Sequence, residues 1–339
     1  MLIFAIETSC DETAAAVVAD GRKIVSNVVS SQIKLHAKYS GVVPELASRA
    51  HIENINIVIA SALKKAGLSF EGFAKKVSAI TYTRGPGLAG SLLVGQMAAE
   101  TLSAVTGVPL TAVNHLEGHI FAAMLEHKDL KPPFLSLIVS GGHTELVIVK
   151  DFGSYRYLGG TRDDAAGEAF DKVARFMGLP YPGGPVIDRL SKDGDPEKIH
   201  FTRPMLKGSW DFSFSGIKTA VVNIVKSSPG FKKEDICASF QSAVVETLVA
   251  KTLSAAAQYC LKKIVLGGGV AANSALRKHM AAAAKTSGIK LYLPSVKLCT
   301  DNAAMMGCAG YYKYKALGAA GKGIGGIEPG LKLSSWNKR

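Results

Sequence analysis

One pattern occurs twice in this chain of 339 residues: an apolar strand, a short polar turn and a second apolar strand. The first copy occupies residues 2–19 and the second occupies residues 134–149. Both turns place hydroxyl and carboxylate side chains beside backbone amides, around Thr8-Ser9-Cys10-Asp11 and around Ser140-Gly141-Gly142-His143. A repeat of this kind indicates a duplicated structural unit, so the sequence predicts two lobes of similar construction.

Strands and helices alternate through the rest of the chain. Apolar, β-rich runs predict further strands at residues 22–31, 77–82, 110–113 and 264–266. Helical patterns predict helices at residues 44–65, 88–106, from Asn114 onward, 271–285 and 301–317. This alternation favours an α/β fold in which helices cover a sheet in each lobe, with the two lobes facing one another across a cleft.

Composition excludes several other classes. The chain is 47% hydrophobic and 20% charged, whereas a disordered chain has low hydrophobicity and high charge density. Its 35 glycines have no three-residue period, so it is not collagen-like. Five cysteines, an odd number with no C-x-x-C spacing, fit a reducing compartment. The N-terminus has no basic region typical of a signal peptide, and polar residues interrupt the apolar stretch 88–110. We therefore expect a soluble cytoplasmic protein without a membrane partner.

The chain carries a strong excess of positive charge. It has 40 Lys and Arg against 27 Asp and Glu, a formal charge of +13. Many basic residues form scattered doublets such as Lys64-Lys65 and Lys262-Lys263, which solvated helix ends explain as well as function does. The alternative is a polyanionic partner, most simply a nucleic acid.

Glycine-rich turns follow apolar strands at Ser140-Gly141-Gly142 and Gly267-Gly268-Gly269, and Gly183-Gly184 forms a third glycine pair. Such turns let backbone N–H groups approach a phosphate, and a helix that begins directly afterwards adds its positive end. Tight packing requires glycine as well, so one such turn is weak support for a nucleotide site. Neither a Walker A motif nor a G-x-G-x-x-G fingerprint occurs, which disfavours P-loop and Rossmann folds.

The segment His115-Leu116-Glu117-Gly118-His119 places two histidines four residues apart. On a helix this spacing brings both imidazoles to one face, where they can share a metal ion; two surface histidines are the alternative. The motif differs from H-E-x-x-H of metalloproteases, because Glu117 lies one position too late. Asp301 is the best candidate for a third ligand, and its alternative role is the N-cap of a helix.

A third cluster contains carboxylates near glycines. Asp164, Glu168 and Asp171 have i, i+4, i+7 spacing, which either forms a solvated acidic helix face or serves a ligand. The turn Tyr181–Pro185 and Asp188 follow closely, and carboxylates beside a glycine turn suit ribose hydroxyls. Asn273 could contact another sugar or a base edge.

These motifs carry a family resemblance over essentially the whole chain. They occur in one order: Ala5–Thr13, His115–His119, Val139–Thr144, Asp164–Lys172, Tyr181–Pro185, Gly267–Asn273 and Cys299–Asn302. In this the chain resembles the bacterial form of the universal tRNA threonylcarbamoyladenosine transferases. The resemblance implies the two-lobed fold of actin, acetate kinase and sugar kinases, with duplicated ribonuclease-H-like domains and an interlobe cleft. We expect residues 1–130 plus about 302–330 in the N-terminal lobe and 131–301 in the C-terminal lobe.

The resemblance also implies a reaction: threonylcarbamoyl-AMP donates its threonylcarbamoyl group to N6 of adenosine 37, in tRNAs that read codons beginning with A, and AMP is released. By the same resemblance His115, His119 and Asp301 match the ligands of one divalent metal ion, usually iron, with zinc as an alternative. Archaeal and eukaryotic relatives have a metal-binding Tyr where this chain has Ile138. The residues that match substrate contacts are Ile138, Val139, Ser140, Gly141, Gly142, Asp171, Gly184, Asp188 and Asn273.

This chemistry needs an activated carbonyl, because an exocyclic adenine amine is a poor nucleophile. A metal ion with an open position can polarise an oxygen, and backbone amides at Ser140–Gly142 could stabilise developing negative charge. Since AMP is a good leaving group, no protein nucleophile is required, and we interpret Cys10 as structural. Asp11 or Glu12 is our candidate for the group that accepts the amine proton.

The resemblance further implies partners: tRNA, a smaller paralogous subunit of the same fold that contacts helices of the N-terminal lobe, and a small ATPase subunit. Three other functions fit parts of the sequence. A small-molecule kinase of the same fold would use the phosphate-binding turns but has no need for the histidine pair. A metalloprotease would use the histidines but lacks the correctly spaced glutamate. A non-enzymatic actin-like scaffold would need neither.

Overall fold

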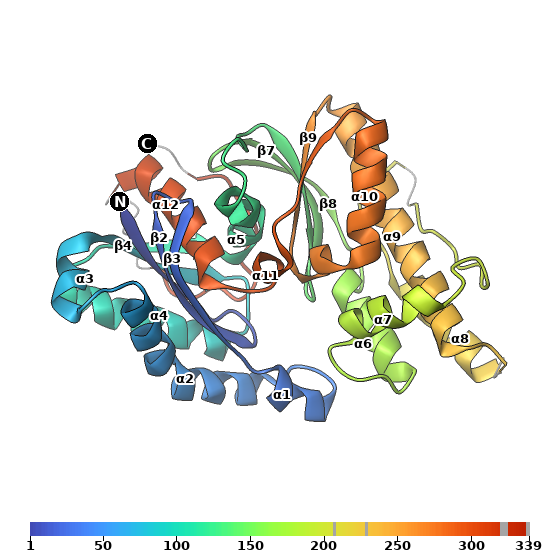
Figure 1. Cartoon of the computed structure of the whole chain (residues 1–339), viewed down its shortest axis with the longest axis horizontal. Helices are drawn as coiled ribbons and strands as arrows, with labels where there is room; N and C mark the ends of the chain where they lie inside the picture. Colours follow the sequence, from blue (N-terminus) through green and yellow to red (C-terminus); the bar gives the residue numbers. More distant parts are fainter. Residues whose placement is uncertain (206–207, 228–229, 319–324, 337–339) are drawn as a thin grey trace. The chain divides into compact units, whose positions relative to one another are not determined.

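Two units make up the described part of the chain, which a computed structural model gives for residues 1–205, 208–227, 230–318 and 325–336 (Figure 1). Unit 1 contains the described residues of Met1–Leu130, Asp151–Tyr155 and Thr300–Arg339. Unit 2 contains those of Lys131–Lys150 and Arg156–Cys299. Because the chain returns to unit 1 at Thr300, slightly before the boundary expected from the sequence, Asp301 belongs to the same unit as His115 and His119.

Unit 1 is built on a sheet of order β3-β2-β1-β4-β5. Its strands are β1 (Leu2–Glu7), β2 (Glu12–Ala19), β3 (Lys23–Ser31), β4 (Val77–Gly85) and β5 (Leu110–Asn114). The pairs β1–β2 and β2–β3 are antiparallel, whereas β1–β4 and β4–β5 are parallel. The central strand β1 therefore has a hairpin on one side and two parallel strands on the other.

Unit 2 repeats this construction, with a sheet of order β10-β9-β6-β7-β8. Its strands are β6 (Phe134–Val139), β7 (Thr144–Asp151), β8 (Ser154–Gly160), β9 (Lys263–Gly267) and β10 (Lys290–Tyr292). The pair β6–β7 is antiparallel, and β6–β9 and β9–β10 are parallel. The two sheets have the same strand order when counted from their central strands, so the duplication predicted from the repeat is confirmed.

Helices cover both faces of the sheet in unit 1. They are α1 (Ile33–His36), α2 (Pro44–Lys65), α3 (Phe70–Lys76), α4 (Ala89–Thr106), α5 (His115–Phe121) and α12 (Ala303–Leu317). Alternate residues of β1 separate the faces. Phe4 packs in a core with Phe73 of α3 and Ile59 of α2, whereas Ala5 faces Gly307 of α12. The period-2 pattern of the strand thus produces two cores, one on each side of the sheet.

The helices of unit 2 are α6 (Ala166–Phe176), α7 (Gly183–Leu190), α8 (Ser215–Ser227), α9 (Lys233–Gln258), α10 (Ser274–Thr286) and α11 (Val296–Cys299). One core joins Leu135 and Leu137 of β6 to Phe170 of α6 and Phe240 of α9. Helices α9 and α10 lie side by side and pack together (Figure 1). No helix in the described part of the chain has the length and apolar character needed to cross a membrane.

The sequence predicted two helix starts too early. Residues Gly269–Ala272 form a short 3₁₀ turn, and Asn273 caps α10 by accepting a hydrogen bond from the Leu276 amide (2.9 Å). Likewise Asn302 caps α12 by accepting from the Met305 amide (3.1 Å). In both cases an asparagine ends the preceding loop and the helix begins one residue later.

In each unit the carboxyl ends of the parallel strands meet at one edge of the sheet. In unit 1 the ends of β1, β4 and β5 bring together Glu7, Thr83 and the start of α5. In unit 2 the ends of β6 and β9 bring together Val139 and Gly267.

Candidate active site

Helix α5 begins with a capping box. The Leu116 amide donates to Asn114 Oδ1 (2.8 Å), and the Asn114 amide donates to Glu117 Oε2 (3.3 Å). Glu117 also accepts from the Tyr155 hydroxyl (2.9 Å) and from the indole N–H of Trp336, which ties two distant segments of unit 1 to this helix. A carboxylate that accepts these three hydrogen bonds is not aimed at the histidine pair, which agrees with the sequence argument against a metalloprotease.

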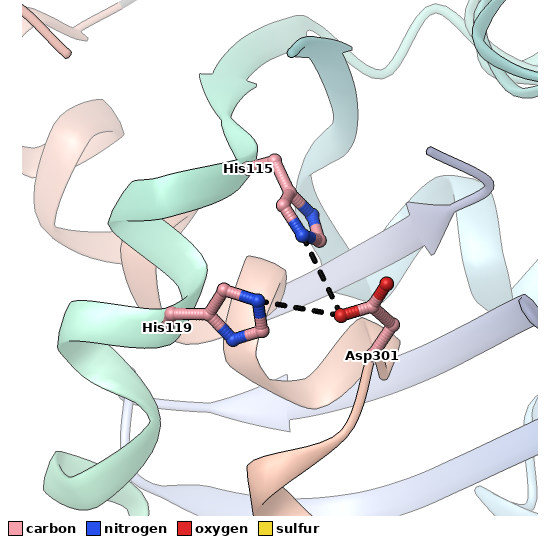
Figure 2. Close-up of side chains that lie close together, drawn as sticks. All are labelled: His115, His119 and Asp301. Carbon is pink, nitrogen blue, oxygen red and sulfur yellow. Dashed lines mark ion pairs between the residues drawn. The ribbon is translucent and has the colours of Figure 1, made fainter. Parts of the chain in front are cut away.

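His115 and His119 project from α5 toward Asp301, as Figure 2 shows. Asp301 Oδ1 lies 3.5 Å from Nε2 of His115 and 3.4 Å from Nε2 of His119. One ligand atom from each residue lies within 4.8 Å of the others, and both histidines are buried. The three residues therefore form a group that can hold one metal ion.

Close packing between α5 and α12 brings Asp301 to the histidines. A Cβ atom at Gly118 would lie 2.5 Å from the Met306 sulfur, so only glycine allows this approach without a shift. Asp301 is not the N-cap of α12, since Asn302 fills that role. The alternative interpretation of Asp301 as a capping residue is therefore wrong, and its carboxylate is available to the histidine pair.

Glu7, at the end of β1, contacts Nδ1 of His115, the ring nitrogen that does not face Asp301. Its carboxylate accepts from the Ser9 amide (2.5 Å) and the Thr83 hydroxyl (2.5 Å), and His115 Nδ1 lies 3.1 Å from Oε2. Burial opposes the charged form, but His115, Ser9 and Thr83 lower the pKa of Glu7 to about 2. Because an ionised carboxylate only accepts, Nδ1 carries the proton and Nε2 faces Asp301. A carboxylate–imidazole pair of this kind is the arrangement that orients histidine ligands in metal sites.

Negative charge is crowded around the trio. Burial, followed by the charges of Asp11 and Asp301, raises the pKa of Glu12 to about 10. Burial and the carboxylates of Glu7 and Asp11 raise the pKa of Asp301 to about 6, despite the attraction of His115. A cation at this position would relieve the repulsion. Two imidazoles and a carboxylate in such an environment fit Fe²⁺ or Zn²⁺.

Cys10 lies beside these carboxyl groups. Burial and the charges of Asp11 and Asp301 raise the pKa of its thiol well above the usual range. A thiol that keeps its proton is a poor nucleophile, which supports the structural interpretation of Cys10.

In unit 2, two hydrogen bonds join the ends of the first glycine turn, Ser140 to His143. The Ser140 amide donates to the His143 carbonyl (2.8 Å), the His143 amide donates to Ser140 Oγ (3.1 Å), and Gly141 and Gly142 between them are exposed. The Ser140 carbonyl accepts from the Gly167 amide (3.1 Å), so the N-terminus of α6 meets this turn. The second turn is adjacent: Gly268 has φ +93°, and a Cβ there would lie 2.3 Å from the Val139 carbonyl oxygen. Two turns and one helix N-terminus thus meet.

The other predicted substrate residues of unit 2 gather around α7. The Gly183 amide, at the start of α7, donates to Asp171 Oδ1 (2.7 Å). Gly184 and Asp188 lie four residues apart on this helix, and Asp188 accepts from the hydroxyl of Ser274 (2.8 Å), the neighbour of Asn273. The amide group of Asn273 donates to Gln241 (2.6 Å) while its oxygen caps α10, so this side chain also has a structural role.

The spacing of Asp164, Glu168 and Asp171 predicted that all three lie on one helix face, and the structure places only Glu168 and Asp171 on a helix. Helix α6 begins at Ala166, so Asp164 precedes it and is buried between the ammonium groups of Lys172 and Lys218. The sequence did not point to Lys218. It also did not point to Glu7, Thr83 and Gly118, which lie around the metal trio, the name we give to His115, His119 and Asp301. A polar residue at the end of an apolar strand was the available signal for Glu7.

Comparisons with known proteins show the family to which the chain belongs. The family model of tRNA N6-adenosine threonylcarbamoyltransferase matches residues 23–308. The chain is 56% identical to the tRNA N6-adenosine threonylcarbamoyltransferase of Endomicrobium trichonymphae, over 99% of each chain. It is 53% identical to that of Clostridioides difficile strain 630, over 93% of each. The chain belongs to this family. As a tRNA threonylcarbamoyltransferase it is an enzyme of t6A formation in tRNA.

Solved structures outside the tRNA threonylcarbamoyltransferases share the fold. Component A of the (R)-2-hydroxyglutaryl-CoA dehydratase of Acidaminococcus fermentans matches with a TM-score of 0.56 at 15% identity, over 93% of this chain and 99% of that one. Full-length HypF, in its phosphate- and nucleotide-bound form, matches with a TM-score of 0.63 at 16% identity, over 94% of this chain and 56% of that one. These matches confirm the actin-like fold predicted from the sequence.

Proposed function

We propose that the enzyme transfers the threonylcarbamoyl group from threonylcarbamoyl-AMP to N6 of adenosine 37, in tRNAs that read codons beginning with A, and releases AMP. Membership of the family supports tRNA as the acceptor. The observation that carries the chemistry is that His115, His119 and Asp301 each offer one ligand atom, and these atoms lie within 4.8 Å of one another. The transfer is an acyl transfer that needs an activated carbonyl and no protein nucleophile.

The trio is proposed to hold one divalent ion, iron in preference to zinc. When bound, such an ion supplies Lewis-acid polarisation of an acyl oxygen. The residues of the chain do the rest of the positioning: Glu7 keeps Nε2 of His115 directed at the site, and Gly118 lets Asp301 approach.

The turn Ile138–Gly142 is proposed to bind the phosphate and acyl region of the donor. Its exposed glycines leave the backbone open to an anion, and the N-terminus of α6 adds positive potential. Asp171, Gly184, Asp188 and Asn273 are proposed to surround the adenosine. Their common position around α7 supports this role, although Asp188 and Asn273 share it with bonds to Ser274 and Gln241.

A base must accept the proton that leaves N6. The sequence offered Asp11 and Glu12. Both lie close to Asp301, and burial with the charges of Asp11 and Asp301 raises the pKa of Glu12. We propose that one of these two carboxyl groups accepts the proton.

Two protein partners are part of the proposal: a smaller paralogous subunit and a small ATPase subunit. Helices α2 and α4 pack together in unit 1 and expose Ile52, Leu93 and Met97, with 62%, 47% and 44% of each residue accessible. Exposed apolar side chains on adjacent helices suit a helical partner such as the paralogue. None of the five cysteines, all in the described part of the chain, forms a disulfide, which suits the cytoplasm, where we place the enzyme.

The test is reconstitution. Labelled threonine, bicarbonate, ATP, an adenylate-forming enzyme, the two partner subunits and unmodified tRNA are combined with the protein. We expect label on adenosine 37 and none on a tRNA with guanosine at that position. Absence of label, in a mixture where a relative from the family succeeds, would refute the proposal. Elemental analysis of the same preparation identifies the metal.

A further inference from the structure

A groove between α6 and α8 in unit 2 plays no part in the site described above. It encloses about 260 Å³ and is lined by Lys172, Arg175 and Phe176 of α6 and by Lys218 and Val222 of α8. The two helices pack against each other. Three of the five lining residues are cationic, so the groove suits an anionic ligand.

Asp164 holds two of these cations in place. Its Oδ1 accepts from Lys172 Nζ and its Oδ2 accepts from Lys218 Nζ, each at 2.6 Å, while Asp164 itself is 8% exposed. Glu168 is a second carboxylate at this cluster, so Asp164 and Glu168 together balance the charges of the two ammonium groups. Each ammonium has three N–H donors, and Lys172 uses a second on Glu168 (2.8 Å). The two ammonium groups are thus fixed side by side with N–H donors left for another anion, and Arg175 supplies the further positive charge of the groove.

Phe176 gives the groove an aromatic ring, and Lys226 adds a fourth cation at its rim. Phe176 is 39% exposed, and Lys226 Nζ lies 5.8 Å from its ring centroid. Cations beside an exposed aromatic ring are the combination that binds single-stranded nucleic acid, in which phosphates pair with the cations and a base stacks on the ring.

The groove is also close to the donor site along a single helix. The first turn of α6 contacts the Ser140 turn through Gly167, and Lys172 and Arg175 follow on the same helix. At about 1.5 Å per residue, they lie roughly 8 and 12 Å further along the axis. A loop of RNA that delivers a base to the Ser140 turn could place neighbouring nucleotides at the groove.

We propose that the α6–α8 groove binds the backbone of the tRNA loop next to the adenosine being modified. Lys172, Lys218, Arg175 and Lys226 contact phosphates, and Phe176 stacks on an unpaired base. This inference rests on the proposed function, because it takes the RNA to be the tRNA whose adenosine reacts.

The experiment measures tRNA binding by the full-length protein, with its partner subunits, across a salt series. The test variants are Arg175→Ala, Lys226→Ala and Phe176→Leu, which leave the Asp164 network intact. We expect each cation variant to weaken binding about 5- to 10-fold and to reduce the salt slope by about one. Phe176→Leu should weaken binding without changing the slope. The matched control is Lys285→Ala on α10, which removes one exposed charge elsewhere in unit 2.

Steady-state kinetics separate this inference from the proposed function. If the groove binds tRNA, the variants raise the KM for tRNA and keep kcat. If Arg175→Ala and Lys226→Ala bind tRNA as tightly as Lys285→Ala, the inference is wrong even when wild type modifies adenosine 37. If wild type modifies no tRNA but the groove variants still lose affinity, the groove stands and the proposed function falls.

Discussion

The two units carry different chemistry on the same edge of the same kind of sheet. In unit 1 the carboxyl ends of the parallel strands bear Glu7, Thr83 and the histidine helix, all buried and densely hydrogen-bonded. In unit 2 the equivalent ends run into glycine turns, with exposed backbone at Gly141 and Gly142. The duplicated fold provides this edge in both units. The side chains at the edge of unit 1 suit a cation, whereas the glycines at the edge of unit 2, which have no side chains, suit a phosphate.

The two units also differ in net charge. The sequence within the bounds of unit 1 has 17 Lys and Arg against 14 Asp and Glu, whereas unit 2 has 23 against 13. Unit 2 therefore supplies ten of the 13 excess positive charges. Near neutrality in unit 1 is compatible with a cation site crowded with carboxylates, and the excess in unit 2 is where a polyanion is attracted.

The largest effect should come from removing a metal ligand in unit 1. We expect His119→Ala to lose the bound metal and to lower the rate of adenosine modification by more than about 100-fold, with tRNA affinity unchanged. His279→Ala, at an exposed position of α10, is the matched control. Elemental analysis with a single-turnover assay checks both. A His119→Ala protein that keeps one metal ion per chain would contradict the assignment.

A backbone change should damage unit 2 without affecting the metal. Gly268→Ala places a Cβ 2.3 Å from the Val139 carbonyl oxygen at a φ of +93°, and we expect a loss of about 2–4 kcal/mol in the free energy of unfolding. Gly288→Ala is the control, because its φ is +62° but nothing lies within 4 Å of the added atom. Urea unfolding measures both. Equal losses would show that the contact between the two turns is unimportant.

Glu7 tests whether the buried network of unit 1 tunes the metal. Glu7→Gln keeps the shape but removes the charge that orients His115, so we expect metal affinity to fall about 10- to 100-fold. Glu53→Gln makes the same chemical change at an exposed position of α2. Competition with a chromophoric chelator gives the affinities. If the two variants bind metal equally, Glu7 has no orienting role.

The smallest effect concerns a carboxyl group of unit 2. Burial raises the pKa of Glu145 to about 7. Between its unfolded value of 4.5 and about 7 the folded protein binds this proton more tightly, so its contribution to stability is lost as the pH rises through that window. Glu145→Gln should therefore flatten the fall in stability between pH 4.5 and 7.5. Parallel pH profiles for wild type and variant would rule this out.

Local patterns made much of the fold predictable. Helix α2 begins and ends where the sequence predicted, because Pro44 marks its start and its apolar residues recur with helical spacing. Helix α9 was not predicted, since its buried residues include polar ones such as Gln241 and surround the helix without a clear polar face. The short edge strand β10 was missed as well, with only three residues to signal it.

A local pattern also made the two histidines of the metal trio predictable. The i, i+4 spacing of His115 and His119 fixes them on one face of a helix whatever surrounds it. The contact between Glu7 and His115 was not, because it spans 108 residues and depends on which strands are neighbours. The ion pairs of Asp164 were hidden for a similar reason, since Lys218 reaches it from a separate helix.

The route of the chain through unit 1 has a consequence for synthesis on the ribosome. Glu7 emerges first and His115 soon after, but Asp301 and Trp336, which complete the metal trio and cover Glu117, are made only after the whole of unit 2. A growing polypeptide therefore exposes two histidines long before their carboxylate partner exists. Translation that stops within unit 2 would therefore yield a product that lacks both the carboxylate of Asp301 and the contact of Trp336 with Glu117.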